Sequence, residues 1–349
     1  MTLRPLTAAD AADVFAVFAA PAVMRYWNSP PPKDLADAGE WAAHLEDMQR
    51  RLGYAQWRVA ERAGDRLVGI AGLQPLDGGP EVELTYALEP SAWGRGYATE
   101  AGAAALEYGF GEAGLERVVA IAREENRGSV AVLRRLGLRP LGAARYWGKP
   151  WAKYALPASA WREERAAATP PLRTERLELR RFAAADRDPL AGVFGDPAVM
   201  RFVGAERRPL DEPQLAAALA VAGQHWEQLG YGPLAVVERA SGRLVGEAGL
   251  QPLDGGPDVE LTYTFARAAW GRGYATEAAR AVLRWAFAGL LLPRVEAVAD
   301  PGNHASLRVL EKLGMAPLGP RECYASVLAE WGMTFGAWRE LAGPAPARG

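Results

Sequence analysis

Two glycines flank an arginine in the string WGRGYATEA, which occurs twice, at residues 93–101 and 270–278. In each copy a run with helical spacing follows directly, ATEAGAAALEYGF in the first and ATEAARAVLRWAF in the second. A glycine-rich turn that leads into a helix exposes unpaired backbone N–H groups and the positive end of the helix dipole. The string therefore predicts a binding site for an anion such as a phosphate in each half of the chain.

The repeat extends well beyond this string. Arg66–Tyr86 recurs as Arg243–Tyr263, and Asn126–Gly142 recurs as Asn303–Gly319, each at an offset of 177 residues. A period of this size indicates a duplicated domain, because solenoid repeats have units of roughly 20–50 residues. Between the copies, residues 161–174 are first charged, then small, and then contain a proline pair. This composition predicts domains at 1–165 and 172–342 with a linker at 166–171. The composition of residues 343–349 predicts a disordered tail.

Composition narrows the class of protein. The 349 residues are 50% hydrophobic and 23% charged, with a formal net charge of −2. This balance gives no electrostatic basis for binding nucleic acid or an anionic membrane. One cysteine, Cys323, excludes an intrachain disulfide and a cysteine-rich metal site, and we expect no metal. The N-terminus has no signal-peptide pattern and no apolar stretch reaches membrane-spanning length, so we expect a cytoplasmic protein.

Hydrophobic periodicity predicts the elements of each half. The expected order is β-α-α-β-β-β-α-β-α-β-β, an α/β (α+β) fold with a mixed sheet. In the first half, residues 41–53 form a helix that ends at Gly53, and residues 56–62, 66–76 and 82–88 form consecutive strands. Adjacent strands at the start favour antiparallel pairing. The glycine turn and the helix from Ala98 would connect two neighbouring parallel strands.

These blocks, in this order and present twice, resemble a known family. The series strand, WGRGYATEA, helix, strand, NxxS, helix, LG is similar to the GNAT superfamily of acyl-CoA-dependent N-acetyltransferases, more closely to its RimJ/RimL branch. TERLELRRF, at the start of the second half, is that branch's usual opening. The resemblance implies two tandem GNAT domains that use acetyl-CoA as acyl donor. Trp93 and Trp270 stand where the wider superfamily usually has Gln or Arg.

The resemblance also implies which residues hold the pyrophosphate of acetyl-CoA. Glycine lets the backbone approach a phosphate closely, and the arginine and threonine add charge and a hydroxyl. The alternative is a plain strand-to-helix turn in which the glycines serve only conformation. The residues expected at the acetyl-CoA site are Leu88, Trp93, Gly94, Arg95, Gly96, Tyr97, Ala98, Thr99 and Asn126 in the first half, and Phe265, Trp270, Gly271, Arg272, Gly273, Tyr274, Ala275, Thr276 and Asn303 in the second.

Attack of an amine on a thioester needs a base for the amine proton and an acid for the departing thiolate. The resemblance suggests Glu83 and Glu260 as bases, on the strand before the glycine turn. Strand alternation puts Glu83 on the face opposite Tyr86. A solvated edge-strand carboxylate is the alternative. Ser129 and Ser306 are the candidate acids, three residues after the helix-capping Asn; an incidental capping serine is the alternative.

The expected function is transfer of an acetyl group to a primary amine, either a protein N-terminus or a small molecule such as an aminoglycoside or polyamine. Residues 26–30 and 145–151, rich in tryptophan and tyrosine, would line the acceptor groove, or serve as core packing. The alternative function is a non-catalytic acyl-CoA-binding or scaffold protein. We expect the halves to form an intrachain pseudo-dimer, with further homodimerisation possible.

Overall fold

The structure is a computed structural model, which describes residues 1–62 and 64–342. The predicted disordered tail at 343–349 lies outside the described residues. The chain divides into two compact units, Met1–Glu163 with Phe335–Gly349, and Glu164–Thr334. The unit boundary lies close to the predicted domain boundary near residue 165. The last helix groups with the first unit, although its sequence position would assign it to the C-terminal domain.

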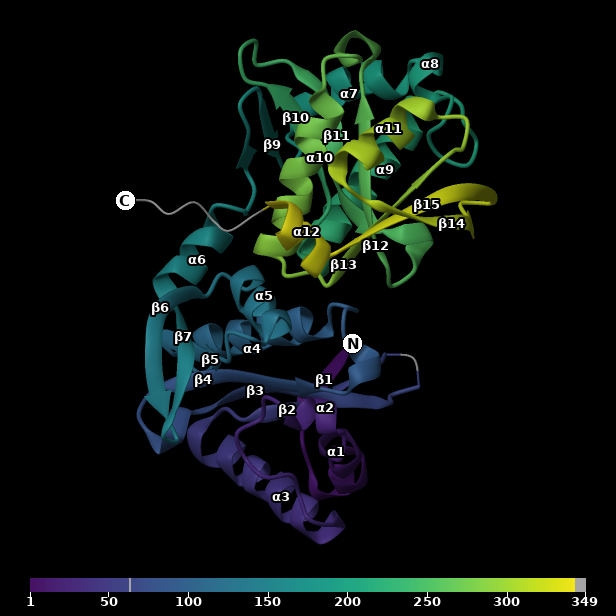
Figure 1. Cartoon of the computed structure of the whole chain (residues 1–349). Coiled ribbons are helices and arrows are strands. Elements are labelled where there is room, and N and C mark those ends of the chain that lie inside the picture. The colour runs from purple at the N-terminus through teal and green to yellow at the C-terminus, as the bar shows by residue number, and fades with distance from the viewer. Residues whose placement is uncertain (63, 343–349) are drawn as a thin grey trace. The chain divides into compact units, whose positions relative to one another are not determined.

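The first unit contains one sheet and helices on both of its faces (Figure 1). Its strands are β1 (Thr2–Pro5), β2 (Gln56–Ala60), β3 (Leu67–Pro75), β4 (Val82–Leu88), β5 (Arg117–Ala122), β6 (Arg139–Tyr146) and β7 (Lys149–Pro157). Its helices are α1 (Ala11–Phe18), α2 (Pro21–Met24), α3 (Leu35–Leu52), α4 (Tyr97–Gly111), α5 (Arg127–Arg135), most of α6 (Ala158–Ala166), and α12 (Phe335–Ala342).

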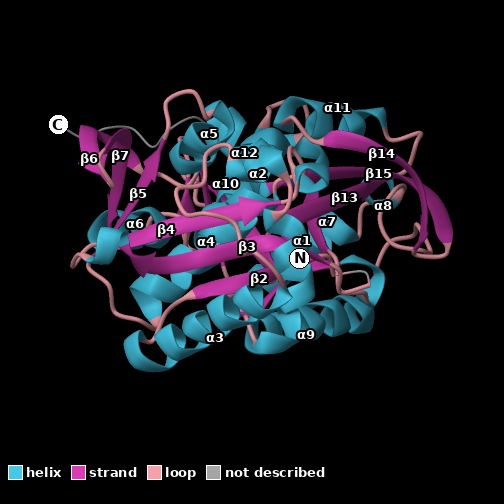
Figure 2. Cartoon of the chain, turned by 60° about the horizontal axis from the view of Figure 1, so that its bottom comes forward, coloured by secondary structure: helices cyan, strands magenta, loops and turns pink. Residues whose placement is uncertain are grey.

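The strand order in the first sheet is β1-β2-β3-β4-β5-β7-β6. Neighbours pair antiparallel except β4 and β5, which are parallel and share a single register pair, Glu83 with Val119. The two strands join through the glycine turn and α4, so the predicted crossover between parallel neighbours is confirmed. Because pairing stops after this one position, β4 and β5 separate on the side that leads to the turn. Figure 2 shows β2, β3 and β4 side by side.

The two faces of this sheet carry different side chains. Ile70 of β3 and Ala87 of β4 lie in one buried cluster with Val14 and Phe18 of α1 and Leu45 of α3. On the opposite face, Ala71, Tyr86 and Leu88 pack with Ala101 of α4. Strand residues therefore alternate between a face covered by α1 and α3 and a face covered by α4. Glu83 shares the first face with Ala87, because the two are separated by an even number of positions along β4.

The second unit repeats this plan. Its strands are β8 (Leu172–Arg173), β9 (Leu177–Arg180), β10 (Pro233–Glu238), β11 (Leu244–Pro252), β12 (Val259–Phe265), β13 (Arg294–Ala299), β14 (Ala316–Cys323) and β15 (Ser326–Thr334). Its helices are α7 (Arg187–Phe194), α8 (Pro197–Met200), α9 (Glu212–Leu229), α10 (Tyr274–Arg284), which continues as a π-helical turn over Trp285–Gly289, and α11 (His304–Leu313). The sheet order is β14-β15-β13-β12-β11-β10-β9-β8, again with one parallel pair, β12 with β13.

The predicted order of elements is confirmed in both units, with a few additions. The four-residue helices α2 and α8, the closing helices α6 and α12, and the two-residue strand β8 were not expected. α6 ends at Ala166, the first residue of the predicted linker. Within residues 1–62 and 64–342, no helix is long and apolar enough to cross a membrane.

Candidate active site

The glycine turn between β4 and α4 presents backbone donors to open space. Gly94 and Gly96 have φ of 73° and 87°, a conformation that L side chains rarely adopt. A Cβ added at either would meet nothing within 4 Å. In the described part of the chain, the backbone N–H groups of residues 94–98 have no hydrogen-bond partner, whereas Thr99 N–H already donates to Gly96. The turn therefore has the geometry of an anion site.

The second copy has the same backbone. Gly271 and Gly273 have φ of 71° and 79°, and Gly273 precedes α10 as Gly96 precedes α4. One difference is that a Cβ on Gly273 would lie 3.5 Å from Arg176, whose guanidinium donates to the Arg272 carbonyl at 2.8 Å. The second turn is thus bordered by an additional cation.

The polar side chains of the turn are largely engaged within the protein. Trp93 Nε1 donates to the Leu88 carbonyl at 2.7 Å while 52% of the residue's surface stays exposed. Arg95 pairs with Glu61 at 2.8 Å, and Thr99 is buried. In the second half, Trp270 Nε1 donates to the Phe265 carbonyl at 2.8 Å. Arg272 pairs with Glu238 at 2.8 Å, and the pKa of Glu238 is lowered to about 2. The donors of the turn that remain unpaired are therefore those of the backbone rather than those of Arg95 or Thr99.

Asn126 and Ser129 lie at the start of α5, as predicted. The Asn126 side chain caps the helix by accepting from Ser129 N–H at 3.1 Å, and Asn303 accepts from Ser306 N–H at 3.2 Å. Ser129 Oγ lies 2.9 Å from the Tyr86 hydroxyl, and Ser306 Oγ lies 2.8 Å from the Tyr263 hydroxyl.

These two tyrosines are buried, and burial controls their ionisation. Burial raises the pKa of Tyr86 and raises that of Tyr263 to about 12. Both hydroxyls are therefore protonated at neutral pH. Each Tyr–Ser pair can hold and pass a proton at the α4 or α10 face of its sheet.

Glu83 is buried in the middle of the first sheet, with 6% of its surface exposed. This excludes the solvated edge-strand alternative. Gln74 of β3 donates to Glu83 Oε2 at 3.2 Å, and Gln56 of β2 donates to Gln74 at 2.5 Å, so three strands contribute to one chain of side chains. Burial raises the pKa of Glu83 to about 7, against opposing hydrogen bonds from Gln74 and the Ile121 backbone. A carboxyl group with this pKa exchanges its proton readily near neutral pH.

Glu260 has the same place in the second sheet but a different set of partners. Gln251 donates to Glu260 Oε2 at 2.9 Å, as the matched Gln74 does to Glu83. The Tyr324 hydroxyl also donates to Oε2, at 2.5 Å. Burial raises the pKa of Glu260, opposed by the hydrogen bonds from Tyr324 and Gln251. Tyr324 takes the position of Trp147 in the first half, whose side chain is exposed.

The carboxyl group and the hydroxyl pair lie on opposite faces of the strand before the glycine turn. Glu83 points to the α1/α3 face and Tyr86 to the α4 face, three residues apart, where β4 and β5 begin to separate. A reacting group between the diverging strands would have a proton acceptor on one side and a proton donor on the other. Glu260 and Tyr263 repeat this arrangement beside β13.

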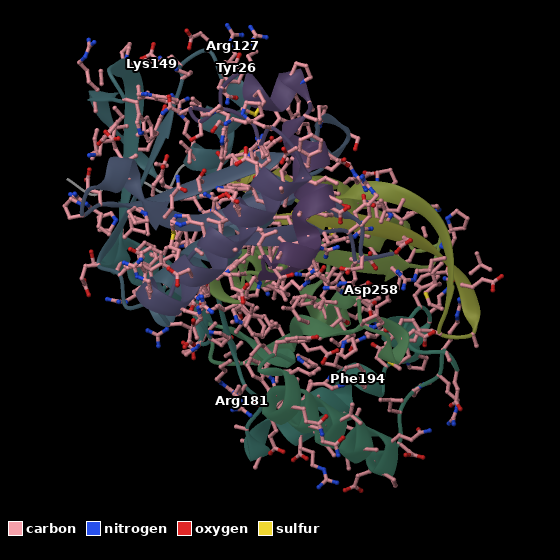
Figure 3. The ribbon with its side chains drawn as sticks, turned by 90° about the horizontal axis from the view of Figure 1, so that it is seen from below. Tyr26, Arg127, Lys149, Arg181, Phe194 and Asp258 are labelled. Carbon is pink, nitrogen blue, oxygen red and sulfur yellow. The ribbon has the colours of Figure 1, made fainter. Side chains whose placement is uncertain are left out.

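The aromatic segments proposed for the acceptor belong to the first unit. In Figure 3 the labelled Tyr26, Arg127 and Lys149 lie along one margin of this unit. Trp147 and Trp151 form an edge contact at 5.9 Å between ring centroids, and Arg123 stacks over Trp151 at 4.3 Å. Trp147 is exposed while Trp151 is buried, so the hairpin between β6 and β7 presents one indole ring and packs the other.

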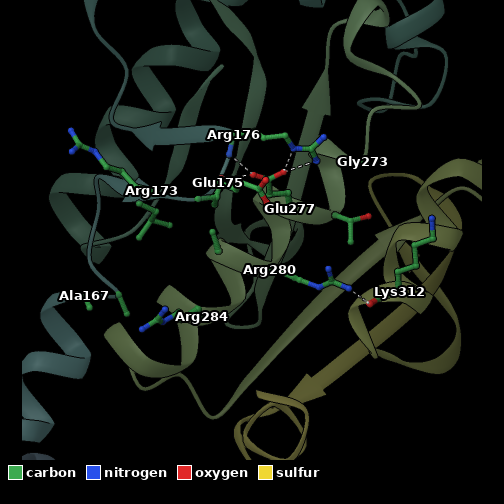
Figure 4. Close-up of a pocket in the computed structure, with 14 residues that line it drawn as sticks. Ala167, Arg173, Glu175, Arg176, Gly273, Glu277, Arg280, Arg284 and Lys312 are labelled. Atoms are coloured by element: carbon green, nitrogen blue, oxygen red, sulfur yellow. Dashed lines mark hydrogen bonds and ion pairs between the residues drawn. The ribbon is translucent and has the colours of Figure 1, made fainter. Parts of the chain in front are cut away.

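The second unit also has a cavity of about 590 Å³ beside α10 (Figure 4). It borders the glycine turn at Gly273 and extends along α10, and its lining includes Arg280, Arg284 and Lys312. Arg280 donates to the Lys312 carbonyl at 3.0 Å, while Arg176 is paired with Glu277. Basic side chains thus extend from the glycine turn along α10.

Sequence reasoning did not identify Tyr86, Tyr263, Gln74, Gln251 or Tyr324. One signal was available: Gln74 and Tyr86 lie in the longest repeated block and are identical in both copies. Pairing the predicted strands in register would have placed Gln74 opposite Glu83. No comparable signal marks Tyr324, because its partner position in the first half is a tryptophan.

Comparison with known proteins gives the same family for both halves. A model described as an acetyltransferase (GNAT) domain matches residues 1–139 and 176–316. YkkB of Bacillus subtilis, an uncharacterized protein, is 34% identical over 166 residues, which cover 45% of this chain and 88% of YkkB. Spermidine N(1)-acetyltransferase of Escherichia coli K12 is 28% identical over 136 residues, 39% of this chain and 70% of that enzyme.

A solved acetyltransferase from Agrobacterium tumefaciens str. C58 is 30% identical and covers 47% of this chain and 94% of its own, with a TM-score of 0.43. Several further relatives are named N-acetyltransferases, including p20 of Bacillus licheniformis, at 27% identity over 42% of this chain and 83% of p20. The chain therefore belongs to the GNAT acetyltransferase family and is an acyltransferase with two such domains in tandem.

Proposed function

We propose that each half transfers an acetyl group from acetyl-CoA to an amine. The observation that carries this proposal is the repeated association of three features: a glycine turn with unpaired N–H groups, a buried glutamate and a buried Tyr–Ser pair. Each feature alone has structural explanations. Their occurrence around the same strand in both halves is best explained by a shared chemistry.

The turn fits the pyrophosphate of acetyl-CoA. The N–H groups of residues 94–98 and 271–275 are unpaired in the described structure, and a Cβ at Gly94 or Gly96 would project into empty space. Donors of this kind at a helix N-terminus are suited to a doubly charged diphosphate. Acetyl-CoA would supply the acetyl group as a thioester. The separation of β4 from β5 would give its pantetheine arm a place between the two strands.

The side chains of the site would handle the protons. Glu83 and Glu260 would take the proton of the incoming ammonium group, since an amine attacks only when neutral. The Tyr86–Ser129 and Tyr263–Ser306 pairs would deliver a proton to the departing sulfur from the opposite face. Protonated tyrosine and near-neutral glutamate are the ionisation states that these two roles require.

The alternative is an acyl-CoA-binding scaffold without catalysis. Such a protein would need the glycine turns but not the glutamates and hydroxyl pairs. Both halves retain both, which favours catalysis. The similarity to spermidine N(1)-acetyltransferase supports a small amine as acceptor, and a peptide N-terminus is the second candidate.

Titration calorimetry with CoA tests the cofactor, and acetyl-CoA turnover against a panel of amines and peptides tests the reaction. We expect about two CoA per chain and turnover with at least one amine. The absence of CoA binding would overturn the whole proposal. Binding without turnover on any amine would instead favour the scaffold.

A further inference from the structure

The hairpin between β14 and β15 turns at Tyr324 and Ala325, which both have a left-handed backbone. Their φ angles are 51° and 55°. Bulky residues rarely adopt this conformation, and a two-residue hairpin turn of this kind favours Asn-Gly. The matched turn of the first half is Trp147 and Gly148, so one of its two residues is glycine. The second half therefore holds two side chains in a turn that disfavours both, and the contacts of Tyr324 must offset this cost.

The Tyr324 hydroxyl contacts three polar groups. It lies 3.0 Å from the Asp254 backbone N–H, 3.3 Å from Gln251 Nε2 and 2.5 Å from Glu260 Oε2. An N–H group and an amide nitrogen can only donate, so the hydroxyl accepts from both, and its single hydrogen remains for the carboxylate. Burial and the charge of Glu260 raise the pKa of Tyr324, so this hydrogen is kept at neutral pH. The contacts themselves therefore determine that Tyr324 donates to Glu260.

Two donors meet the same oxygen of Glu260. Gln251 donates to Oε2 at 2.9 Å and Tyr324 donates to it at 2.5 Å, whereas no group of the described chain donates to Oε1. Hydrogen bonds of this kind orient a carboxylate and favour its charged form. Oε1 is therefore the oxygen left to take a proton. In the first half, Gln74 donates to Glu83 Oε2 at 3.2 Å, and no tyrosine hydroxyl of the described chain joins it.

Other ionisable groups also surround Glu260, and loss of the Tyr324 hydroxyl would leave all of them in place. They lie on the neighbouring strands, on the turn after β11 and on α9, and they are Glu247, Asp254, Glu296, Arg321, Cys323 and His225. The charged side chains of α7 and the other charged side chains of α9 are exposed. The charge of Arg321 lowers the pKa of Glu260, and that of Asp254 raises it. A variant that lacks only the hydroxyl therefore isolates the effect of Tyr324.

We propose that Tyr324 is a positioning residue for the base of the second half, which anchors Oε2 of Glu260 so that Oε1 takes the proton of the amine. This rests on the proposed acetyl transfer at Glu260. The ammonium proton moves to Oε1 and its bonding pair stays on the nitrogen, where it is available to attack the thioester carbonyl. Tyr324 keeps its own proton throughout. The first half has the exposed Trp147 at this position and would use Glu83 without such an anchor.

Carboxyl-carbon NMR of the full chain, labelled at glutamate, follows the ionisation of Glu260 without any turnover. The Glu260 resonance is assigned by its loss in Glu260→Gln. We expect Tyr324→Phe to move the titration midpoint of Glu260 upward by about one pH unit, because a donor to the ionised form is lost. Tyr231→Phe is the matched control, since Tyr231 is a half-buried tyrosine of the same unit whose hydroxyl has no hydrogen-bond partner among the described residues. It should leave the midpoint unchanged.

The reciprocal variant, Trp147→Tyr, adds the hydroxyl to the first half. Gln74 and Asp77 match Gln251 and Asp254, and Asp77 and Asp254 both have φ of 50°. Trp147 has φ of 47°, close to the 51° of Tyr324. A tyrosine at this position should therefore reach the same groups and lower the titration midpoint of Glu83. Such a gain of contact cannot result from poor folding. An unchanged midpoint of Glu260 in Tyr324→Phe would overturn the assignment.

The pH dependence of kcat/KM connects this anchor to the reaction. It is measured in the full chain with the first half silenced by Gly96→Asp, and the ionisation of the amine itself is the same for every variant. We expect Tyr324→Phe to move the rise in kcat/KM to higher pH by the same amount as the NMR midpoint, and Tyr231→Phe to leave it in place. A loss that is equal at every pH would mean that Tyr324 has only a structural role, which contradicts the proposal. If the unmodified chain acetylates no amine but the NMR midpoint still moves, the proposed transfer fails and the anchoring of Glu260 stands.

Discussion

Glu83 lies on a central strand, and this position determines how the carboxyl group ionises. A glutamate on an edge strand would be solvated and fully charged at neutral pH. Between β3 and β5, the Gln74 amide and the Ile121 backbone are the groups of the described chain that stabilise its negative charge. The sheet therefore holds Glu83 in a state in which it can accept a proton and release it again at neutral pH.

This ionisation makes stability depend on pH in a defined direction. The pKa of Glu83 is about 7 in the folded chain and 4.5 in the unfolded chain, so the folded state retains a proton that the unfolded state loses between these values. The contribution of Glu83 to the free energy of unfolding is fully present below pH 4.5 and is lost as the pH rises through about 7. We expect Glu83→Gln, which cannot ionise, to be more stable than the unmodified chain at pH 8 by up to about 3 kcal/mol, with the gap closing toward pH 4.5.

Urea unfolding of Glu83→Gln and of the unmodified chain, at pH 5 and pH 8, measures this difference in the free energy of unfolding. Glu124→Gln, a change at an exposed glutamate after β5, provides the control for removal of a charge. A gap between Glu83→Gln and the unmodified chain that is the same at both pH values would contradict the assignment of a raised pKa. Turnover by the first half should rise through the same pH range, because the ionised carboxylate is the proposed base.

At the scale of single residues, sequence reasoning identified the groups that stand in a motif and missed their partners. Glu83 and Ser129 follow from the resemblance, and the capping role of Asn126 follows from its position before a helix. For Tyr86, the sequence predicted only that its side chain lies on the face of the strand opposite Glu83. Its hydrogen bond to Ser129 was missed because the two residues are 43 positions apart. Contacts of this kind depend on how a helix packs on a strand, which local patterns do not encode.

At the scale of elements, the glycine turn and the helix after it act as one unit. Two left-handed glycines turn the chain so that the N-terminus of α4 and five backbone N–H groups are exposed together. Gly96→Asp would place a carboxylate and a strained φ at this point, against the charge of a diphosphate. We expect loss of the first CoA site, with calorimetric stoichiometry falling from about two to about one.

The comparison variant is Gly111→Asp, at the other end of α4, where an added Cβ also meets nothing within 4 Å. It introduces the same charge away from the turn and should leave stoichiometry at two. Gly273→Asp is a weaker test, since Arg176 lies close enough to pair with the new carboxylate. Retention of two sites in Gly96→Asp would show that the turn does not bind CoA.

Helices and strands could be predicted where their hydrophobic pattern extends over many residues. The strands of the first sheet, the crossover helix and α3 from Trp41 onward follow from spacing and from caps such as Gly53, but α3 begins six residues earlier than predicted, at Leu35. α2 has four residues, too few to show a helical period. α6 was missed because WREERA is charged and precedes a proline pair, which resembles a linker, and only the burial of Trp161 distinguishes it.

At the scale of the whole chain, the two halves retain the residues proposed for acetyl-CoA and catalysis and differ at residues proposed for the acceptor. The glycine turns, the glutamates, their Gln partners and the Tyr–Ser pairs are retained in both. Differences concentrate at Ile70/Glu247, at Trp147/Tyr324 and on α3 and α9. A duplicated domain that had lost catalysis would be expected to drift first at the site residues, since its core is held by packing. The opposite pattern supports our proposal of two working sites that take different acceptors.

Two working sites predict a particular result from single and double substitutions. Glu83→Gln and Glu260→Gln, made separately, should each leave partial turnover on an acceptor that both halves use, because the other half still has its base. The double variant should fall by the full value of general-base catalysis, roughly 10²- to 10⁴-fold. Steady-state release of CoA measures turnover, and calorimetry should still find two CoA per chain in all three variants. If one single variant is silent on every acceptor while the other abolishes turnover, only one half is catalytic and the retained residues of the other serve binding alone.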